Sequence, residues 1–208
     1  METLCGELSK IRRETAQTLT ERMREGLSDL NFLNVEFTME FRRLSHYTAG
    51  GFDEAEFLIS TNPGEPPRPL GAVASGGELS RIMLAIKAVL AETDDIPTLI
   101  FDEIDTGISG RTAQMVSEKL SLIAGSHQVI CITHLPQIAA MADSHYEIRK
   151  TAKENRTVTQ IKRLSEDQMT DELARLLGGA EITEAVRQNA REMRALAAEK
   201  KRLNRQTP

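Results

Sequence analysis

Apolar residues recur at helical spacing along the first thirty residues of the chain. They lie three or four positions apart for most of this stretch, among many charged residues: Leu4, Leu8, Ile11, Leu19, Met23, Leu27 and Leu30. This spacing predicts an amphipathic helix with a narrow apolar stripe. A narrow stripe between charged faces is typical of the end of a coiled-coil arm, with an ordinary surface helix as the alternative. Because the pattern changes after Leu30, we divide the chain into residues 1–30 and 31–208.

The next part of the chain alternates between apolar and polar residues, which is typical of half-buried strands. The alternation predicts one strand at residues 35–41 and a shorter one at 56–60. Residues 61–69 contain four prolines and predict an exposed loop, because proline lacks the N–H that a central strand needs. Further along, residues 146–149 and 157–161 predict an antiparallel pair.

Helical periods and short apolar strands alternate in the central part of the chain. We predict helices at 78–90 and 112–123 and apolar strands at 98–101 and 128–133. Strands that are apolar throughout and separated by helices indicate a sheet covered on both faces. Two helices, at 167–177 and 183–203, end the chain. The predicted class is therefore α/β, with a mainly parallel sheet flanked by helices.

Composition limits the possible partners. The net charge is −5, from 26 basic and 31 acidic residues, so nucleic acid is not attracted globally and any DNA contact must be local. We interpret the basic residues near the C-terminus as a solvated tail, with a DNA-binding patch as the alternative: Lys200, Lys201, Arg202 and Arg205. The sequence has neither a membrane-length apolar run nor a secretory signal, and Cys5 and Cys131 are far apart. These features predict a cytoplasmic protein with reduced cysteines.

The segment ASGGELSR, at Ala74–Arg81, predicts the start of a helix that can bind an anion. Ser75 and Glu78 have the spacing of a capping box, and Gly76 and Gly77 leave the first N–H groups uncovered. Backbone N–H groups, a serine hydroxyl and the helix dipole together suit a nucleotide's terminal phosphate. A helix that is merely well capped is the alternative. We interpret Arg81 as a surface residue, with pairing to an acid or bracing of this helix as the alternatives.

The segment TLIFDEID, at Thr98–Asp105, is an apolar strand that ends in two carboxylates. Open α/β sheets bind their ligands at the carboxyl ends of the strands. Asp102 suits Mg²⁺, and Glu103 could orient and deprotonate an attacking water. The alternative is a strand that ends in a solvated acidic turn. His134 follows the apolar strand QVICIT and could donate a hydrogen bond to a γ-phosphate, although a histidine at a strand end is more often structural.

The order of these segments carries more information than each segment alone. ASGGELSR resembles the ABC signature, TLIFDEID the Walker B strand, DTGISG the D-loop, and THLPQIA the segment with the switch histidine. The longer segments VASGGELSRIMLAIK, FDEIDTGISGR and THLPQIAAMAD are similar to the RecN family of SMC-like DNA-repair ATPases, within the ABC superfamily. The resemblance covers roughly residues 30–195.

This resemblance implies a partial P-loop NTPase fold: residues 31–208 would be the C-terminal lobe of an ABC/SMC head, and 1–30 the end of its coiled-coil arm. It implies ATP and Mg²⁺ as cofactors, and a homodimer of heads with ATP between them. Ser75, Gly76, Gly77 and Glu78 would bind the nucleotide, and Asp105 would couple the two sites. The implied setting is double-strand break repair and recombination in a bacterial cytoplasm, at the nucleoid. DNA and the N-terminal lobe of the same protein would be the partners.

Two features depart from the pattern of the family. Ala74 replaces the leucine that usually begins the signature, and no G-x-x-x-x-G-K-[ST] occurs in the sequence. That motif cradles the phosphates and supplies a lysine. We therefore expect the chain to be inactive alone. Two other functions stay open at this point: an ABC ATPase of another type, such as a transporter ATPase, and a dimerisation or binding module that does not use nucleotide.

Overall fold

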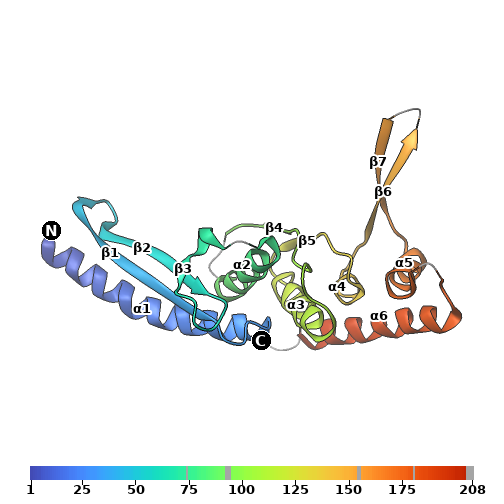
Figure 1. The fold of residues 1–208 in the computed structure, drawn as a ribbon, viewed down its shortest axis with the longest axis horizontal. Coiled ribbons are helices and arrows are strands. Elements are labelled where there is room, and N and C mark those ends of the chain that lie inside the picture. The colour runs from blue at the N-terminus through green and yellow to red at the C-terminus, as the bar shows by residue number, and fades with distance from the viewer. Residues whose placement is uncertain (74, 92–94, 154–155, 180, 205–208) are drawn as a thin grey trace. The chain divides into compact units, whose positions relative to one another are not determined.

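A computed structural model describes residues 1–73, 75–91, 95–153, 156–179 and 181–204 (Figure 1). The chain forms two compact units. The first unit is Met1–Pro97 together with Phe101–Thr106, and the second is Thr98–Ile100 together with Gly107–Pro208. The α/β class is confirmed, because both units contain helices as well as strands. Among the described residues, no helix is both long and apolar enough to span a membrane.

The first unit begins with a long helix that lies against a β-hairpin. Helix α1 (Glu2–Asp29) runs alongside strands β1 (Glu36–Thr48) and β2 (Gly51–Ser60), which pair antiparallel (Figure 1). The predicted helix and both strands are confirmed. The strands are longer than predicted, so the turn between them is shorter than the sequence pattern indicated.

The proline-rich loop predicted at residues 61–69 is wrong at its end. Strand β3 (Arg68–Pro69) pairs antiparallel with β2 and leads into the short helix η1 (Leu70–Ala72). Proline is tolerated there because β3 is the last strand of the sheet, where an N–H on the outer side has no partner to donate to.

The two ends of α1 have different environments. Met23 and Leu27, near its C-terminal end, are fully buried, whereas Leu4 and Ile11 are exposed. A Cβ on Gly26 would lie 3.8 Å from atoms of Ala85 and of Val89, so α1 packs directly on α2 (Gly76–Leu90). The C-terminal half of α1 is therefore part of the core of the first unit, and the division at residue 30 stays a prediction.

Strands β4 (Thr98–Phe101) and β5 (Gln128–Cys131) form a two-stranded sheet that belongs, except for Phe101, to the second unit. Helix α3 (Gly110–Ile123) lies between the two strands in sequence. The hydroxyl of Thr98 donates to Gln128 at 2.9 Å across this sheet. The prediction that helices cover both faces is wrong for this sheet. Three isoleucines on its strands or directly after them are about half exposed or more: Ile100, Ile130 and Ile132.

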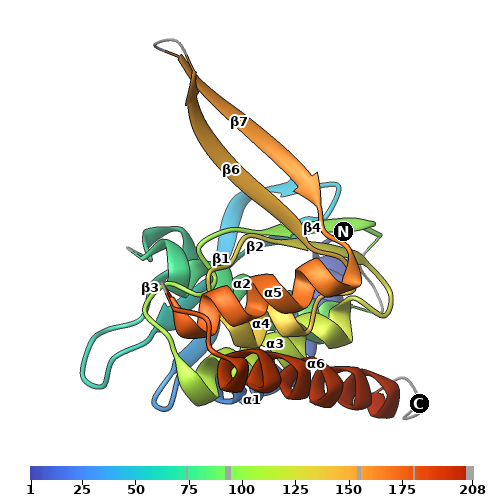
Figure 2. The ribbon, with the colours of Figure 1, turned by 90° about the vertical axis from the view of Figure 1, so that its right-hand side faces the viewer.

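A second hairpin follows, formed by β6 (Tyr146–Lys153) and β7 (Arg156–Arg163). The predicted antiparallel pair is confirmed, and both strands are longer than predicted. The chain ends with α5 (Glu166–Gly178) and α6 (Glu184–Asn204), as predicted. The hairpin extends away from these two helices (Figure 2).

The core of the second unit lies where α5 and α6 meet a short helix, α4 (Pro136–Ala140), which the sequence did not predict. Small residues dominate this core, so the helices approach closely. Its buried members are Ala140, Met141, Leu173, Ala174, Ala190 and Ala197. This packing fixes the segment that directly follows His134.

Candidate functional site

The N-terminus of α2 lies at the surface of the first unit. Ser75 has an extended backbone and its side chain accepts a hydrogen bond from the Glu78 N–H at 3.4 Å, which confirms Ser75 as the cap. Among the bonds of the described residues, the return bond of a capping box, from the Ser75 N–H to the Glu78 side chain, is not formed. Ser75 and Gly76 are exposed, and Ala74 lies outside the described residues. The free N–H groups and the positive end of the helix dipole therefore face solvent and favour an anion.

The two carboxylates form a tight turn after β4, here called the acid turn (residues 102–106). The Asp102 carboxylate accepts from the Glu103 N–H at 2.9 Å, and the Thr106 N–H donates to the Glu103 carbonyl at 3.0 Å. Glu103 has φ +57°, in the left-handed region that residues with a side chain rarely adopt. Asp102 and Glu103 are exposed, so both carboxylates are available to a ligand.

Helix α2 and the acid turn are in direct contact within the first unit. The Ser80 hydroxyl donates to the Asp102 carbonyl at 2.7 Å. A Cβ on Gly77 would lie 2.9 Å from the Thr106 carbonyl oxygen and 3.0 Å from that of Glu103, and a Cβ on Gly76 would overlap the Glu103 carboxylate. The two glycines therefore bring the Glu103 carboxylate beside the helix N-terminus, a juxtaposition that the motifs did not predict.

Arg81 stabilises the contact between α2 and the acid turn. Its side chain is buried and donates to the carbonyls of Ile104 at 3.3 Å and Thr106 at 2.8 Å, and it lies 5.7 Å from the centre of the Phe32 ring. Burial lowers the pKa of the Arg81 guanidinium. Our first interpretation of Arg81 as a surface residue is wrong, and the bracing role is the one observed. Its position four residues after Gly77, on the same face of α2, was the available signal.

Asp105 is buried at 4% exposure, next to the fully buried Ile104. The role implied for Asp105, coupling two sites across an interface, requires it to reach a second copy. That role stays a prediction.

The carboxylates of the acid turn suit a Mg²⁺ ion that is also coordinated by water and by the phosphates of a nucleotide. Among the described residues, no group of three or more His, Cys, Asp or Glu side chains could hold a metal ion. Mg²⁺ seldom needs such a cage, because one or two carboxylates, waters and the phosphates of the substrate complete its shell. The exposed Asp102 suits this arrangement.

His134 lies in the second unit, three residues after the end of β5, and is exposed. The Leu135 N–H donates to the Thr133 hydroxyl at 3.1 Å, which shapes the backbone on both sides of the histidine. The acid turn belongs to the first unit, so the predicted place of His134 beside Asp102 stays a prediction.

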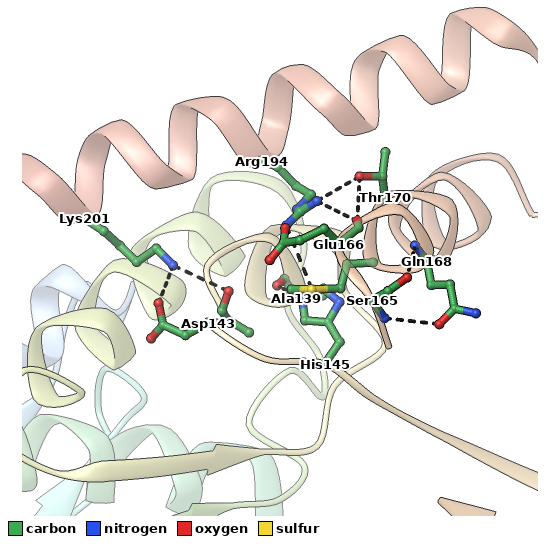
Figure 3. A network of polar contacts seen from close by, with 11 residues as sticks. Ala139, Asp143, His145, Ser165, Glu166, Gln168, Thr170, Arg194 and Lys201 are labelled. Atoms are coloured by element: carbon green, nitrogen blue, oxygen red, sulfur yellow. Dashed lines mark hydrogen bonds and ion pairs between the residues drawn. The ribbon is translucent and has the colours of Figure 1, made fainter. Parts of the chain in front are cut away.

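The segment after His134 is tied to α6 by polar contacts, and α6 is tied in turn to α5 (Figure 3). The His145 Nε2 donates to the Ala139 carbonyl at 2.7 Å, and the Lys201 ammonium donates to the Asp143 carboxylate at 2.8 Å. On the same helix as Lys201, Arg194 contacts Glu166 and Thr170 of α5. Burial, followed by the charge of Arg194, lowers the pKa of His145.

These contacts correct our interpretation of the basic residues near the C-terminus. Lys201 is mostly buried and does not belong to a solvated tail, whereas Lys200, 3.3 Å from the Glu118 carboxylate, and Arg202 are exposed on α6. Arg205 lies outside the described residues. Both lysines are placed by the packing of α6, which the charge run itself did not indicate.

Comparisons with known proteins agree with the motifs. No protein-family model matches the chain. The chain is 43% identical over 194 residues to the DNA repair protein RecN of Halalkalibacterium halodurans, a match that covers 91% of this chain and 34% of that protein. It is 41% identical over 201 residues to the DNA repair protein RecN of Bacillus subtilis, covering 89% and 35%. The chain thus spans about a third of the length of these relatives.

Solved structures share the fold at lower identity. An Smc head domain with a coiled coil and joint, from Pyrococcus yayanosii, matches with a TM-score of 0.55 and 19% identity, over 77% of this chain and 29% of that one. An Smc head domain with an extended coiled coil, from Pyrococcus furiosus, matches with a TM-score of 0.53 and 19% identity, over 79% and 39%. The chain therefore has the fold of part of an SMC head.

Proposed function

Because this chain is RecN-like and has the fold of part of an SMC head, we propose that it is the C-terminal part of an ATP-hydrolysing head that acts in DNA repair. One observation carries the proposal: the glycine N-terminus of α2 and the carboxylates of the acid turn lie together at the surface of one unit. Hydrolysis of a phosphoanhydride requires an anion site and carboxylates, and in a pair of heads one copy would supply the anion site and the other the carboxylates at each nucleotide.

Each side chain then has a distinct task. Asp102 would hold Mg²⁺, which neutralises charge on the transferred phosphoryl group. Glu103 accepts a proton from the attacking water, and its backbone has the left-handed conformation described above. His134 donates a hydrogen bond to the γ-phosphate. All three roles are supported by residue type and exposure.

The anion site at Ser75, Gly76 and Gly77, with Glu78 completing the first turn, would receive the γ-phosphate of a nucleotide bound to a second copy. Two heads would thus close around two ATP molecules, and Asp105 would couple their sites. Loss of the γ-phosphate removes the anion that α2 binds, so the heads separate. We propose that residues 1–30 pass this opening to a coiled-coil arm that handles DNA ends during repair and recombination.

The head needs a second lobe of the same protein. The sequence contains no phosphate-cradling G-x-x-x-x-G-K-[ST] motif, and the chain spans about a third of its relatives. The exposed isoleucines of the β4–β5 sheet support docking of that lobe here: Ile100 is 68% exposed, Ile130 45% and Ile132 50%. Covering apolar side chains of this size is favourable by about 25 cal/mol for each Å² buried.

The test is ATP hydrolysis by the chain alone and by the chain joined to an N-terminal lobe of a RecN relative. We expect negligible turnover alone and turnover with the lobe. Glu103→Gln in the joined protein should lower kcat on the order of 100-fold to 10,000-fold, the usual contribution of a general base. The same variant should hold two heads together in the presence of ATP, measured by size-exclusion chromatography.

The control is Glu181→Gln, because Glu181 is exposed and lies in the second unit, outside the proposed machinery. It should leave kcat unchanged. Turnover that survives Glu103→Gln would reject Glu103 as the base. Absence of ATP binding by the joined protein would favour the dimerisation or binding module that does not use nucleotide.

A further inference from the structure

The β6–β7 hairpin concentrates positive charge in an acidic protein. Its residues, Tyr146–Arg163, include six Lys or Arg and two Glu, in a chain whose net charge is −5. Such a local excess attracts a polyanion even though the whole chain does not. No role in nucleotide chemistry accounts for it, because these strands lie outside the segments that match the ATPase motifs.

The shape of the hairpin is that of an isolated ribbon. In the part of the chain that the structure describes, β6 and β7 form a two-stranded sheet of their own. The hairpin extends away from α5 and α6, which belong to the same unit (Figure 2). Eight residues per strand give a ribbon of about 26 Å, with strands about 4.8 Å apart. Both faces of most of its length are therefore open to solvent.

The register divides the hairpin side chains between two faces. Ile148 pairs with Ile161, and the two are 55% and 69% exposed. Lys150 follows Ile148 on that face and Arg163 follows Ile161, since alternate residues share a face. Lys162 lies on the opposite face. Exposed apolar side chains flanked by cations thus occupy one face, and further positive charge the other.

Some of the positive charge is available to a ligand. Arg149 lies 2.6 Å from the Glu147 carboxylate and is neutralised in part. Lys150, Lys162 and Arg163 make no ion pair within the described residues, and all three are exposed. Arg163 donates only to the Ser144 hydroxyl, at 3.2 Å, which leaves its charge uncompensated.

We propose that the β6–β7 hairpin is a ribbon that binds double-stranded DNA. The major groove, about 12 Å wide, admits a two-stranded β-ribbon, and phosphates on both walls of the groove would meet cations on both faces. Ile148 and Ile161 would contact the apolar edges of bases or sugars. This inference rests on the proposed function for its choice of polyanion. It adds the surface that binds DNA, which the motifs do not indicate.

The test is DNA binding by the 208-residue chain, measured by fluorescence anisotropy with a short labelled duplex at several salt concentrations. The triple variant Lys150→Gln, Lys162→Gln and Arg163→Gln should bind about 10-fold more weakly or worse. The slope of log affinity against log salt should also become shallower, by about 0.9 for each phosphate that the variant no longer neutralises. Thermal unfolding should show that the variant still folds.

A matched variant makes the same change of net charge elsewhere. Arg22, Arg111 and Arg202 are exposed and lie on three other helices, and their replacement by Gln should leave affinity and salt slope near those of the natural chain. Equal losses in both triple variants would overturn the proposal, because attraction would then be general. So would binding to vesicles with anionic lipid but not to DNA.

Failure of this inference can be told apart from failure of the proposed function. A natural chain that binds no duplex overturns the hairpin proposal, whereas the Glu103→Gln measurement of turnover without DNA decides the ATPase proposal. We expect the hairpin variant, joined to an N-terminal lobe, to hydrolyse ATP at the natural rate when DNA is absent. Loss of that basal turnover would mean that the hairpin also affects ATP hydrolysis. It would overturn the proposal that the hairpin serves only to bind DNA.

Discussion

The two contacts that hold the proposed catalytic segments differ in kind. In the first unit, α2 rests on the acid turn through glycine and backbone carbonyls, with Arg81 buried beneath. In the second unit, the segment after His134 is held by long side chains, such as Lys201, that reach exposed acids. The first contact is set by steric fit, whereas the second adds charged pairs to the apolar packing of α4 on α5 and α6. The first contact should therefore tolerate almost no substitution, whereas the second should respond gradually to mutation, salt and pH.

The steric contact gives the largest expected effect. Gly77→Ala places a methyl group about 3 Å from two carbonyl oxygens that cannot move without the turn, so α2 must shift. We expect the free energy of unfolding to fall by about 1–3 kcal/mol, the usual cost of overpacking. In the joined head, displacing α2 relative to Glu103 should lower kcat on the order of 100-fold. Urea denaturation and ATP turnover measure these two effects.

Gly71→Ala is the matched control, because a Cβ on Gly71 would meet nothing within 4 Å and Gly71 is exposed. This variant should change neither the free energy of unfolding nor the turnover. If Gly77→Ala were as harmless as Gly71→Ala, the steric account of the first contact would be wrong.

The sequence predicted the features of these contacts that depend on residues close together in the chain. The cap at Ser75, the helix after it and the strand before Asp102 follow from neighbours within a few positions, and the structure confirms each. Arg81 was misjudged because its burial depends on Phe32, far upstream, and on carbonyls of a turn that lies later in the chain. No window of sequence contains all three partners.

The errors in the second unit have the same origin. The apolar strand at residues 128–133 predicted a covered sheet, but Ile130 and Ile132 are exposed because, among the described residues, no helix covers that face. Helix α4 was missed because five residues are too few to establish a period. Lys201 was assigned to a tail although Asp143, far away in sequence, is its partner.

The charge contacts should give a smaller, pH-dependent effect centred on His145. Burial and Arg194 of α6 lower its pKa, while Glu166 and Glu172 of α5 act in the opposite direction. His145 therefore binds a proton less readily in the folded state than in the unfolded state, where it titrates near its usual pKa of 6.5. The contribution of neutral His145 to the free energy of unfolding is fully present above that pH and is lost as the pH falls through the lowered pKa.

Urea denaturation between neutral and mildly acidic pH measures this effect. His145→Gln can still donate to the Ala139 carbonyl but does not titrate, so the variant should lose less stability on acidification than the natural chain does. At neutral pH we expect it to be less stable by about 1 kcal/mol, because one buried hydrogen bond has poorer geometry. If the free energy of unfolding depended on pH in the same way in both proteins, His145 would not be the cause of the loss of stability on acidification.

The smallest expected effect is that of Lys201, whose partner is exposed. The Lys201 side chain is 18% exposed and that of Asp143 is 65% exposed, so solvent screens the pair. Lys201→Met keeps the apolar stem and removes the charge, and it should lower the free energy of unfolding by less than about 1 kcal/mol. That loss should shrink at high salt.

Lys10→Met, in an exposed pair with Glu14, is the control and should have no measurable effect. A loss above about 2 kcal/mol that salt does not change would mean that α6 is held as rigidly as α2, and the contrast between the two contacts would disappear.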